Sequence, residues 1–279
     1  MNICFIGGGN MATALIGGLL GKGFSAAQIS VVEINADNRA RLQRNFSVRA
    51  FENIAVGIAG SDVIVLAVKP QQMQAVAVQL GPLLSGQIVL TIAAGIRLTD
   101  LMRWLQSQNG VFVRAMPNTP ALIGAGMTGL FSFPPKHMLT QQQLEHIEII
   151  MGAVGSFVWI HSEEEMDAVT AVSGSGPAYF FYFIEALEQA GKELGLPEQT
   201  AQQLAQQTAL GAAKLAHEST EDAATLRARV TSKNGTTECA ILSMEANKVK
   251  QHIITAVHAA AARSREMGDE LGGKSGENQ

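Results

Sequence analysis

The sequence predicts a protein of the α/β class, in which a doubly wound parallel sheet is followed by an all-helical C-terminal domain. Residues 1–161 alternate short apolar runs with helix-like patterns, as repeated strand–helix units do. The run Val63–Val68 is apolar at every position, which is typical of a strand covered by helices on both faces. After Ile160 the strand candidates end, and Ala, Gln, Glu and Leu recur at helical spacing.

The same patterns place the individual elements. The expected strands are Asn2–Ile6, Ile29–Ile34, Val63–Val68, Ile88–Ile92 and Val111–Ala115, with Met127–Phe131 and Ser156–Ile160 extending the edge of the sheet. The helices expected between them include Met11–Lys22, Ala36–Asn45, Gln71–Leu83 and Leu98–Leu105. In the second half we expect helices over Glu163–Val172, Ala178–Leu194, Gln199–Ser219, Ala223–Val230, Thr237–Ala246 and Val249–Met267. The predicted domains are therefore residues 1–161 and 162–271, followed by a polar, Gly-rich and frayed tail over 272–279.

Composition and charge exclude several classes of protein. The 279 residues are 47% hydrophobic and 16% charged, which suits two packed domains. The net charge of -4 and the absence of a Lys/Arg cluster argue against a nucleic-acid partner. The apolar stretches end before the ~20 residues needed to span a bilayer, and the chain does not open on a signal-peptide pattern, so we expect a soluble, cytoplasmic protein without a membrane partner. Cys4, Cys239 and the histidines lack metal-ligand spacing; we expect no metal site and two buried, unpaired thiols.

The segment Gly7-Gly8-Gly9-Asn10-Met11-Ala12 follows a strand and opens a helix, and it matches G-x-G-x-x-G/A. Gly7 would make the tight turn, Gly9 would let the backbone approach a pyrophosphate, and Ala12 would permit close packing of helix on strand. The helix N-terminus would supply N–H donors for the phosphates. With the strand–helix alternation that follows, the loop predicts a Rossmann-like dinucleotide-binding domain.

The residues alone leave the identity of the dinucleotide open. Glu33 closes the second strand, where an acidic residue usually binds a ribose 2′-OH and favours NAD. Asn35 and Arg39 follow it and suit a 2′-phosphate. Two further strand ends, Ala67–Pro70 and Ala93–Gly95, should open on the same crevice, because ligands bind outside the carboxyl ends of such strands.

Four motifs together resemble one enzyme family. They are Phe5–Met11, Ala67–Pro70, Arg114–Pro120 and Ser173–Tyr179, in this order. The set closely resembles the pyrroline-5-carboxylate reductases, and the resemblance runs from Met1 to about Met267. It implies reduction of L-1-pyrroline-5-carboxylate to L-proline, the final step of proline biosynthesis, with NADPH or NADH as reductant. The position of Asn35 tips the expectation toward NADP, and Glu33 leaves NAD as the alternative cofactor.

The resemblance also implies the site residues. The expected cofactor-binding residues are Ile6, Gly7, Gly8, Gly9, Asn10, Met11, Asn35, Asn53, Ala67, Val68, Lys69, Pro70, Ala93, Ala94 and Gly95. The expected substrate-binding residues are Asn118, Ser173, Ser175, Gly176, Ser232, Gly235, Thr236 and Thr237. Thr237 is the expected catalytic residue.

The family loop written Ser-Pro-Gly-Gly-Thr-Thr reads here Ser232-Lys233-Asn234-Gly235-Thr236-Thr237. Asn tolerates a left-handed backbone, so the turn can survive the change. The N–H groups of Gly235, Thr236 and Thr237 would hold the substrate carboxylate at a helix N-terminus, and the Thr237 hydroxyl would orient the ring nitrogen. The alternative interpretation is that both threonines merely cap the helix.

The run Tyr179–Ile184 is apolar on every face of its predicted helix, so that helix should be buried all round. An interlocked homodimer would supply the second surface, and the resemblance implies one. We hypothesise that the Thr237 loop completes its site against the partner chain's nucleotide domain.

Two other functions remain as alternatives. A hydroxyacid dehydrogenase would need a general acid/base, commonly a lysine, but Lys192, Lys214, Lys233, Lys248 and Lys250 sit in no motif. A nucleotide sensor would bind cofactor without turnover.

Overall fold

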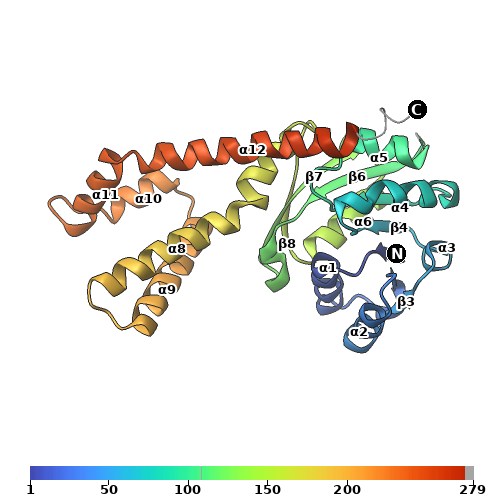
Figure 1. Cartoon of the computed structure of the whole chain (residues 1–279), viewed down its shortest axis with the longest axis horizontal. Coiled ribbons are helices and arrows are strands. Elements are labelled where there is room, and N and C mark those ends of the chain that lie inside the picture. The colour runs from blue at the N-terminus through green and yellow to red at the C-terminus, as the bar shows by residue number, and fades with distance from the viewer. Residues whose placement is uncertain (108, 274–279) are drawn as a thin grey trace. The chain divides into compact units, whose positions relative to one another are not determined.

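The computed structural model describes residues 1–107 and 109–273, and these residues form one eight-stranded sheet with helices around it and a helical region after it (Figure 1). The strands are β1 Ile3–Ile6, β2 Ile29–Val32, β3 Arg49–Phe51, β4 Val63–Leu66, β5 Ile88–Thr91, β6 Val111–Met116, β7 Gly126–Phe133 and β8 Gly155–Trp159. The helices are α1 Asn10–Gly21, α2 Ala36–Phe46, α3 Ile54–Gly57, α4 Met73–Leu80, α5 Leu98–Leu105, α6 Gln141–Gly152, α7 Glu165–Val169, α8 Gly176–Glu193, α9 Glu198–Glu218, α10 Ala223–Arg229, α11 Thr236–Ala246 and α12 Val249–Gly273.

The sheet is doubly wound, with the strand order β3-β2-β1-β4-β5-β6-β7-β8. Alternate residues of each central strand enter two separate cores. Phe5 and Val65 pack with α1 and α6 on one face, whereas Ile64 and Leu66 pack with α4 and α5 on the other. The predicted fold class is therefore confirmed, and the all-apolar strand runs follow from burial on both faces.

The strand β7 departs from the predicted parallel pattern, because it pairs with β6 in the antiparallel direction. Only residues 117–125 connect the two strands. A parallel return needs a crossover of about a dozen residues or more, so the short connection reverses the chain. The helix α6 then supplies such a crossover, and β8 pairs with β7 in parallel.

Other differences are local. The short strand β3 has no apolar run and was not expected. The segment Thr170–Gly174 forms a π-helical turn after α7 rather than the end of a regular helix. Cys4 is buried as expected, but Cys239 is exposed, contrary to expectation. Gly272 and Gly273 lie within α12 rather than in a frayed tail, and residues 274–279 of the predicted tail lie outside the described residues.

The chain divides into two compact units. Unit 1 contains Met1–Gly174 together with Ala260 and the residues after it, and unit 2 contains Ser175–Ala259. These units differ from a single cut at residue 161, because the segment around α7 and the end of α12 group with the sheet. Unit 2 is built from helices α8 to α11 and the first part of α12. None of the described helices is long and apolar enough to cross a membrane.

Candidate active site

The loops after β1, β4 and β5 lie side by side at the carboxyl edge of the sheet. The three strands are neighbours in the sheet, and their last residues, Ile6, Leu66 and Thr91, are in register. The strand order reverses between β1 and β4, so this is the switch point where sheets of this type bind ligands. The loops carry residues of three predicted cofactor segments, which are Ile6–Met11, Ala67–Pro70 and Ala93–Gly95.

The glycine loop has the geometry that a pyrophosphate needs. Gly7 has φ +101°, and a Cβ there would lie 2.7 Å from the Ala67 carbonyl oxygen, so only glycine fits. A Cβ on Gly9 would meet nothing within 4 Å, which leaves the loop open on that side. Gly9 is also the N-cap of α1, and no side chain caps that helix. The N–H donors of its first turn are therefore available to an anion.

The side chains around the glycine loop differ in their exposure, and so in what they can offer a cofactor. Ile6 is buried in the core, so it can offer a cofactor only its backbone. Asn10 is exposed at the start of α1, and Met11 is half-buried. Ala12 is buried, in agreement with its predicted role in packing the helix on the sheet.

The side chain of Glu33 lies against the glycine loop. Its carboxylate accepts the N–H of Gly8 at 3.0 Å and the N–H of Asn35 at 2.9 Å. This carboxylate is therefore not an ordinary solvated charge, and it links the end of β2 to the phosphate loop.

The polar residues around Glu33 are also engaged. The Asn35 side-chain oxygen caps α2 by accepting the N–H of Asn38. Arg39 donates to the carbonyl oxygens of Glu33 and Ile34, at 2.7 and 2.8 Å. Arg41, which the sequence did not single out, donates to the Gly8 carbonyl at 3.2 Å. Arg41 precedes the buried Leu42, and this position is the signal in the sequence that could have predicted that Arg41 faces the edge of the sheet.

The remaining predicted cofactor residues occupy strand ends. Asn53 follows β3, and its side chain caps α3 by accepting the N–H of Val56. Lys69 is exposed, and no salt bridge found among the described residues involves it. Val68 and Pro70 are half-buried beside it. Ala93 and Gly95 are buried and Ala94 is half-buried, so this loop presents backbone and methyl groups.

Asn118 is tied into the protein by three hydrogen bonds. Its amide nitrogen donates to the carbonyl and hydroxyl oxygens of Ser173, both at 3.2 Å, and its oxygen accepts the N–H of Met127 at 2.9 Å. Gly174 lies directly against Met116, because a Cβ there would come 2.6 Å from Met116 Cε. The predicted residues Asn118 and Ser173 thus meet, and Asn118 braces the end of β6 against the π-helical turn.

In unit 2, the loop Ser232–Gly235 ends at the N-terminus of α11. Asn234 adopts φ +59°, as its tolerance of a left-handed backbone allows. The Gly235 N–H donates to the Ser232 carbonyl at 3.0 Å, so this predicted carboxylate donor is already used. Gly235 is the N-cap, and no side-chain hydrogen bond caps the helix. Thr236 and Thr237 are therefore not capping residues.

The N–H groups of Thr236 and Thr237 lie in the first turn of α11, where a helix provides no backbone partner. Thr237 is half-buried, and Thr236 is exposed. The nearby Glu238 carboxylate turns back to accept the Asn234 N–H at 2.6 Å. The arrangement leaves two backbone donors and the hydroxyls of both threonines for a small ligand.

Ser175 and Gly176 begin α8, which is the other predicted substrate segment of unit 2. Ser175 occupies the predicted N-cap position, but its side chain makes no capping hydrogen bond. Gly176 is buried, and Pro177 follows in the first turn, as predicted.

A cavity of about 1110 Å³ lies elsewhere, beside α5. It is lined by Leu98, Met102, Phe131, Phe133, His161 and Glu163 among others, and none of the predicted site residues lines it.

A glycine loop at the switch point of a doubly wound sheet, in a chain that also carries a helical unit, defines a dinucleotide-dependent oxidoreductase of the Rossmann type. The family model described as NADP oxidoreductase, coenzyme F420-dependent, matches residues 2–95, and the model described as pyrroline-5-carboxylate reductase dimerisation matches residues 163–267. The chain is 46% identical to the pyrroline-5-carboxylate reductase of Pseudomonas aeruginosa over 271 residues, which cover 97% of this chain and 98% of the relative. The chain belongs to the pyrroline-5-carboxylate reductase family.

Solved structures agree with this assignment. A pyrroline-5-carboxylate reductase from Coxiella burnetii is 39% identical, with a TM-score of 0.89 over 95% of this chain and 98% of that one. A pyrroline carboxylate reductase from Plasmodium falciparum, solved with NADP bound, is 28% identical, with a TM-score of 0.84 over 96% of this chain and 98% of that one. The resemblance seen in the sequence motifs is confirmed.

Proposed function

We propose that this chain catalyses the reduction of L-1-pyrroline-5-carboxylate to L-proline, with NADPH as the favoured reductant and NADH also accepted. Family membership supports the reaction. The single structural observation that carries the proposal is the uncapped N-terminus of α11 with the Thr237 hydroxyl beside it. Such a terminus suits the carboxylate of the substrate, and the hydroxyl suits its ring nitrogen.

The cofactor, when bound, supplies the hydride, and the protein supplies binding and orientation. The loop Gly7–Gly9 and the first turn of α1 fit its pyrophosphate, because they leave open backbone donors and no Cβ in the way. Ala67–Pro70 and Ala93–Gly95 would flank the rest of the cofactor at the switch point. On α2, Arg39 and Arg41 supply positive charge that favours NADPH, whereas the carboxylate of Glu33 favours NADH.

The substrate is a cyclic imine that carries a carboxylate. In its protonated form the C=N carbon accepts hydride without a strong catalytic acid, so the site needs no Ser/His/Asp set. The N–H groups of Thr236 and Thr237 hold the carboxylate. The Thr237 hydroxyl oxygen accepts the iminium N–H and so fixes the face of the ring that receives hydride.

The proposal includes a division of roles and a homodimer. Residues 1–161 would serve the cofactor, and residues 162–271 would serve substrate and dimerisation. The match to a dimerisation model indicates a homo-oligomer. In the single chain Phe180, Phe181 and Tyr182 of α8 are 67%, 65% and 76% exposed, rather than buried all round. A dimer would bury them, since exposed apolar patches of this kind mark association surfaces.

A groove of about 730 Å³ in the same unit supports this view. Its apolar lining comes from α8, α11 and α12, and its polar lining includes Arg227, Glu245, Lys248, Lys250 and Gln251. The apolar residues are Phe183, Ile241, Met244, Val249, Ile253 and Ile254. The cytoplasmic location expected from the sequence stays a prediction.

One assay tests the reaction and separates the alternatives. The absorbance of NADPH is followed during reaction with 1-pyrroline-5-carboxylate, and the measurement is repeated with NADH instead of NADPH. A third reaction contains a 3-hydroxyacid and the oxidised cofactor. Turnover of the cyclic imine is the expected result. Turnover of the hydroxyacid alone would make the chain a dehydrogenase, and tight NADPH binding without turnover would make it a sensor.

A further inference from the structure

The end of α12 packs directly against the start of α5. Ser264, Gly268 and Gly272 recur every four residues and are buried, so they form one stripe along the helix. A Cβ on Gly268 would lie 2.9 Å from Arg97 Nη2, and a Cβ on Gly272 would overlap the Asp100 carboxylate. The helix backbone therefore lies so close to Arg97 and Asp100 that no side chain fits between them.

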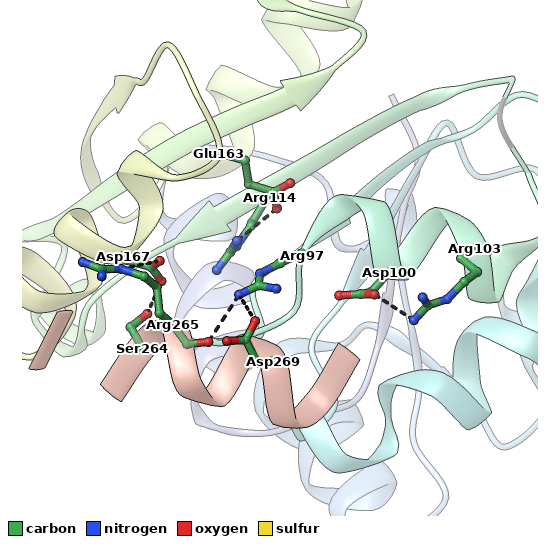
Figure 2. A network of polar contacts seen from close by, with 9 residues as sticks. All are labelled: Arg97, Asp100, Arg103, Arg114, Glu163, Asp167, Ser264, Arg265 and Asp269. Atoms are coloured by element: carbon green, nitrogen blue, oxygen red, sulfur yellow. Dashed lines mark hydrogen bonds and ion pairs between the residues drawn. The ribbon is translucent and has the colours of Figure 1, made fainter. Parts of the chain in front are cut away.

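Ionic contacts hold the helix in this place (Figure 2). Arg97 pairs with Asp269 at 2.7 Å and donates to the Arg265 carbonyl at 3.3 Å. Burial lowers the pKa of Arg97, but the hydrogen bond from Arg97 to Asp269 and the nearby carboxylates raise it above its ordinary value overall. The charge on Arg97 is thus maintained at the contact.

The next residues along both segments extend the contact. Arg103 pairs with Asp100 at 2.7 Å and donates to the Gly272 carbonyl at 2.8 Å. Behind them, the Ser264 hydroxyl donates to Asp167 of α7 at 2.6 Å. The last turns of α12 are therefore fixed to two other helices of unit 1.

The same helix forms one wall of the loop after β5. Gly95 adopts φ +75°, and a Cβ there would lie 2.9 Å from Leu271 Cδ1 and 3.5 Å from Met267 Cβ. Arg97 follows two residues later, and the buried Ile96 lies between them. The loop Ala93–Arg97 is thus enclosed between β5 and the helix and held at its far end by the Arg97–Asp269 pair.

We propose that residues Ser264–Gly272 of α12, with Arg97 as their anchor, position the Ala93–Arg97 loop for the dinucleotide. The inference rests on the proposed function, in which Ala93–Gly95 flank the cofactor. These residues act on the cofactor through the loop and touch no reacting atom. Loss of the anchor therefore weakens cofactor binding in particular, while the loop at Thr237 and its substrate are unaffected.

The test uses the full-length protein and measures three quantities. The first is the Kd of NADPH without substrate, and the second is the pair of KM values for NADPH and 1-pyrroline-5-carboxylate. The third is hydrogen exchange of the peptide that contains residues 92–98, without cofactor. The variants are Asp269→Asn, which removes the charge, and Gly268→Ala, which displaces the Arg97 guanidinium. Glu266→Gln is the matched control, since within residues 1–107 and 109–273 the salt bridge of Glu266 is with Arg263 of the same helix, at 3.0 Å.

We expect Asp269→Asn to weaken NADPH binding about fivefold, the upper range for a partly exposed ion pair. The amides of residues 92–98 should exchange faster, and the KM for the imine and kcat should stay within twofold. Asp269→Glu should restore most of the affinity, and Glu266→Gln should change nothing. An unchanged NADPH Kd and unchanged exchange in Asp269→Asn would overturn the inference, whether or not Gly268→Ala folds. A wild-type protein that binds NADPH but leaves the imine unreduced would instead overturn the proposed function, since the Kd comparison needs no turnover.

Discussion

The carboxylate of Glu33 accepts the backbone N–H of Gly8 at 3.0 Å, so a negative charge lies against the loop proposed to bind the phosphates. Its second oxygen accepts the N–H of Asn35, the N-cap of α2. The acidic residue and the helix that carries Arg39 and Arg41 are thus joined at the end of β2, where we propose that the ribose 2′ group of the cofactor binds.

Glu33→Gln should shift cofactor preference toward NADPH. The substitution keeps a hydrogen-bond acceptor for Gly8 but removes the charge that repels a 2′-phosphate. We expect the ratio of kcat/KM for NADPH over NADH to rise about tenfold, which corresponds to about 1.4 kcal/mol. Glu52→Gln is the control, because Glu52 is an exposed carboxylate that also contacts Arg39. An unchanged ratio in Glu33→Gln would show that Glu33 has no part in selecting the cofactor.

Thr237→Ala should reduce kcat roughly a hundredfold, the size of effect expected when a reacting ring is misplaced by about 1 Å. NADPH affinity should hardly change, because Thr237 lies outside the proposed cofactor segments. Thr237→Ser keeps the hydroxyl and should retain most of the activity. Steady-state kinetics and an NADPH titration of each variant check this. Full turnover by Thr237→Ala would remove the hydroxyl from the mechanism.

Subunit mixing tests the hypothesis that the Thr237 loop of one chain serves the nucleotide domain of its partner. Gly7→Val should abolish cofactor binding, because a side chain at Gly7 meets the Ala67 carbonyl. The Gly7→Val variant is mixed with Thr237→Ala under conditions that exchange subunits. Each mixed dimer should then have one intact site, so activity should return to about a quarter of wild type or less. If the mixture stays as inactive as its components, each chain carries a complete site of its own.

The buried ion pair between Arg114 of β6 and Glu163 should be costly to break from one side. Arg114 Nη1 lies 3.0 Å from Glu163 Oε1, with side chains only 6% and 16% exposed, and the same oxygen accepts the Leu98 N–H at 2.7 Å. Glu163→Ala leaves a buried charge unpaired and should lower the free energy of unfolding by about 3–5 kcal/mol. Urea unfolding at fixed protein concentration measures it. The double variant Arg114→Leu/Glu163→Leu should lose less free energy of unfolding than Glu163→Ala. An equal or larger loss in the double variant would contradict this account.

Cys4 should make stability depend on pH in the alkaline range. Burial raises the pKa of the Cys4 thiol from 9.0 to about 11. As pH rises, the Cys4 thiol therefore ionises in the unfolded chain before it ionises in the folded protein. Its contribution to the free energy of unfolding is fully present below pH 9 and is lost between pH 9 and 11. The loss by pH 11 is about 2 kcal/mol. Comparing urea unfolding of the wild type and Cys4→Ala across this range isolates the effect, and parallel pH curves would rule it out.

The sequence predicted the elements wherever burial imposes a period. Leu98–Leu105 was placed to the residue because its buried Leu98, Leu101 and Leu105 recur at helical spacing. The strand β3 was missed because Arg49 is exposed and the strand spans three residues at the sheet edge. The reversal at β7 depends on the length of a connection, which no periodicity reveals.

The site divides in the same way. The glycine loop could be predicted because one local segment carries all of its chemistry. The hydrogen bonds between Asn118 and Ser173 join residues 55 positions apart, and the packing of Gly268 on Arg97 spans an even longer stretch of chain. Those partners are chosen by tertiary structure, so motifs could name Asn118 and Ser173 but not the way in which they meet.

The helix α12 begins in unit 2 and ends in unit 1, and this has a consequence for the synthesis of the protein. Residues of α12 that pack against unit 1 follow all of unit 2 in the chain, so the ribosome adds them after unit 2 has been translated. Domains of a growing chain commonly fold in order from the N-terminus. Here the contact between α12 and the loop after β5 can form only after the helical unit has been synthesised. A stop codon near residue 260 would leave most of the helical unit in place and remove the α12 residues that pack on Arg97 and Asp100 of unit 1.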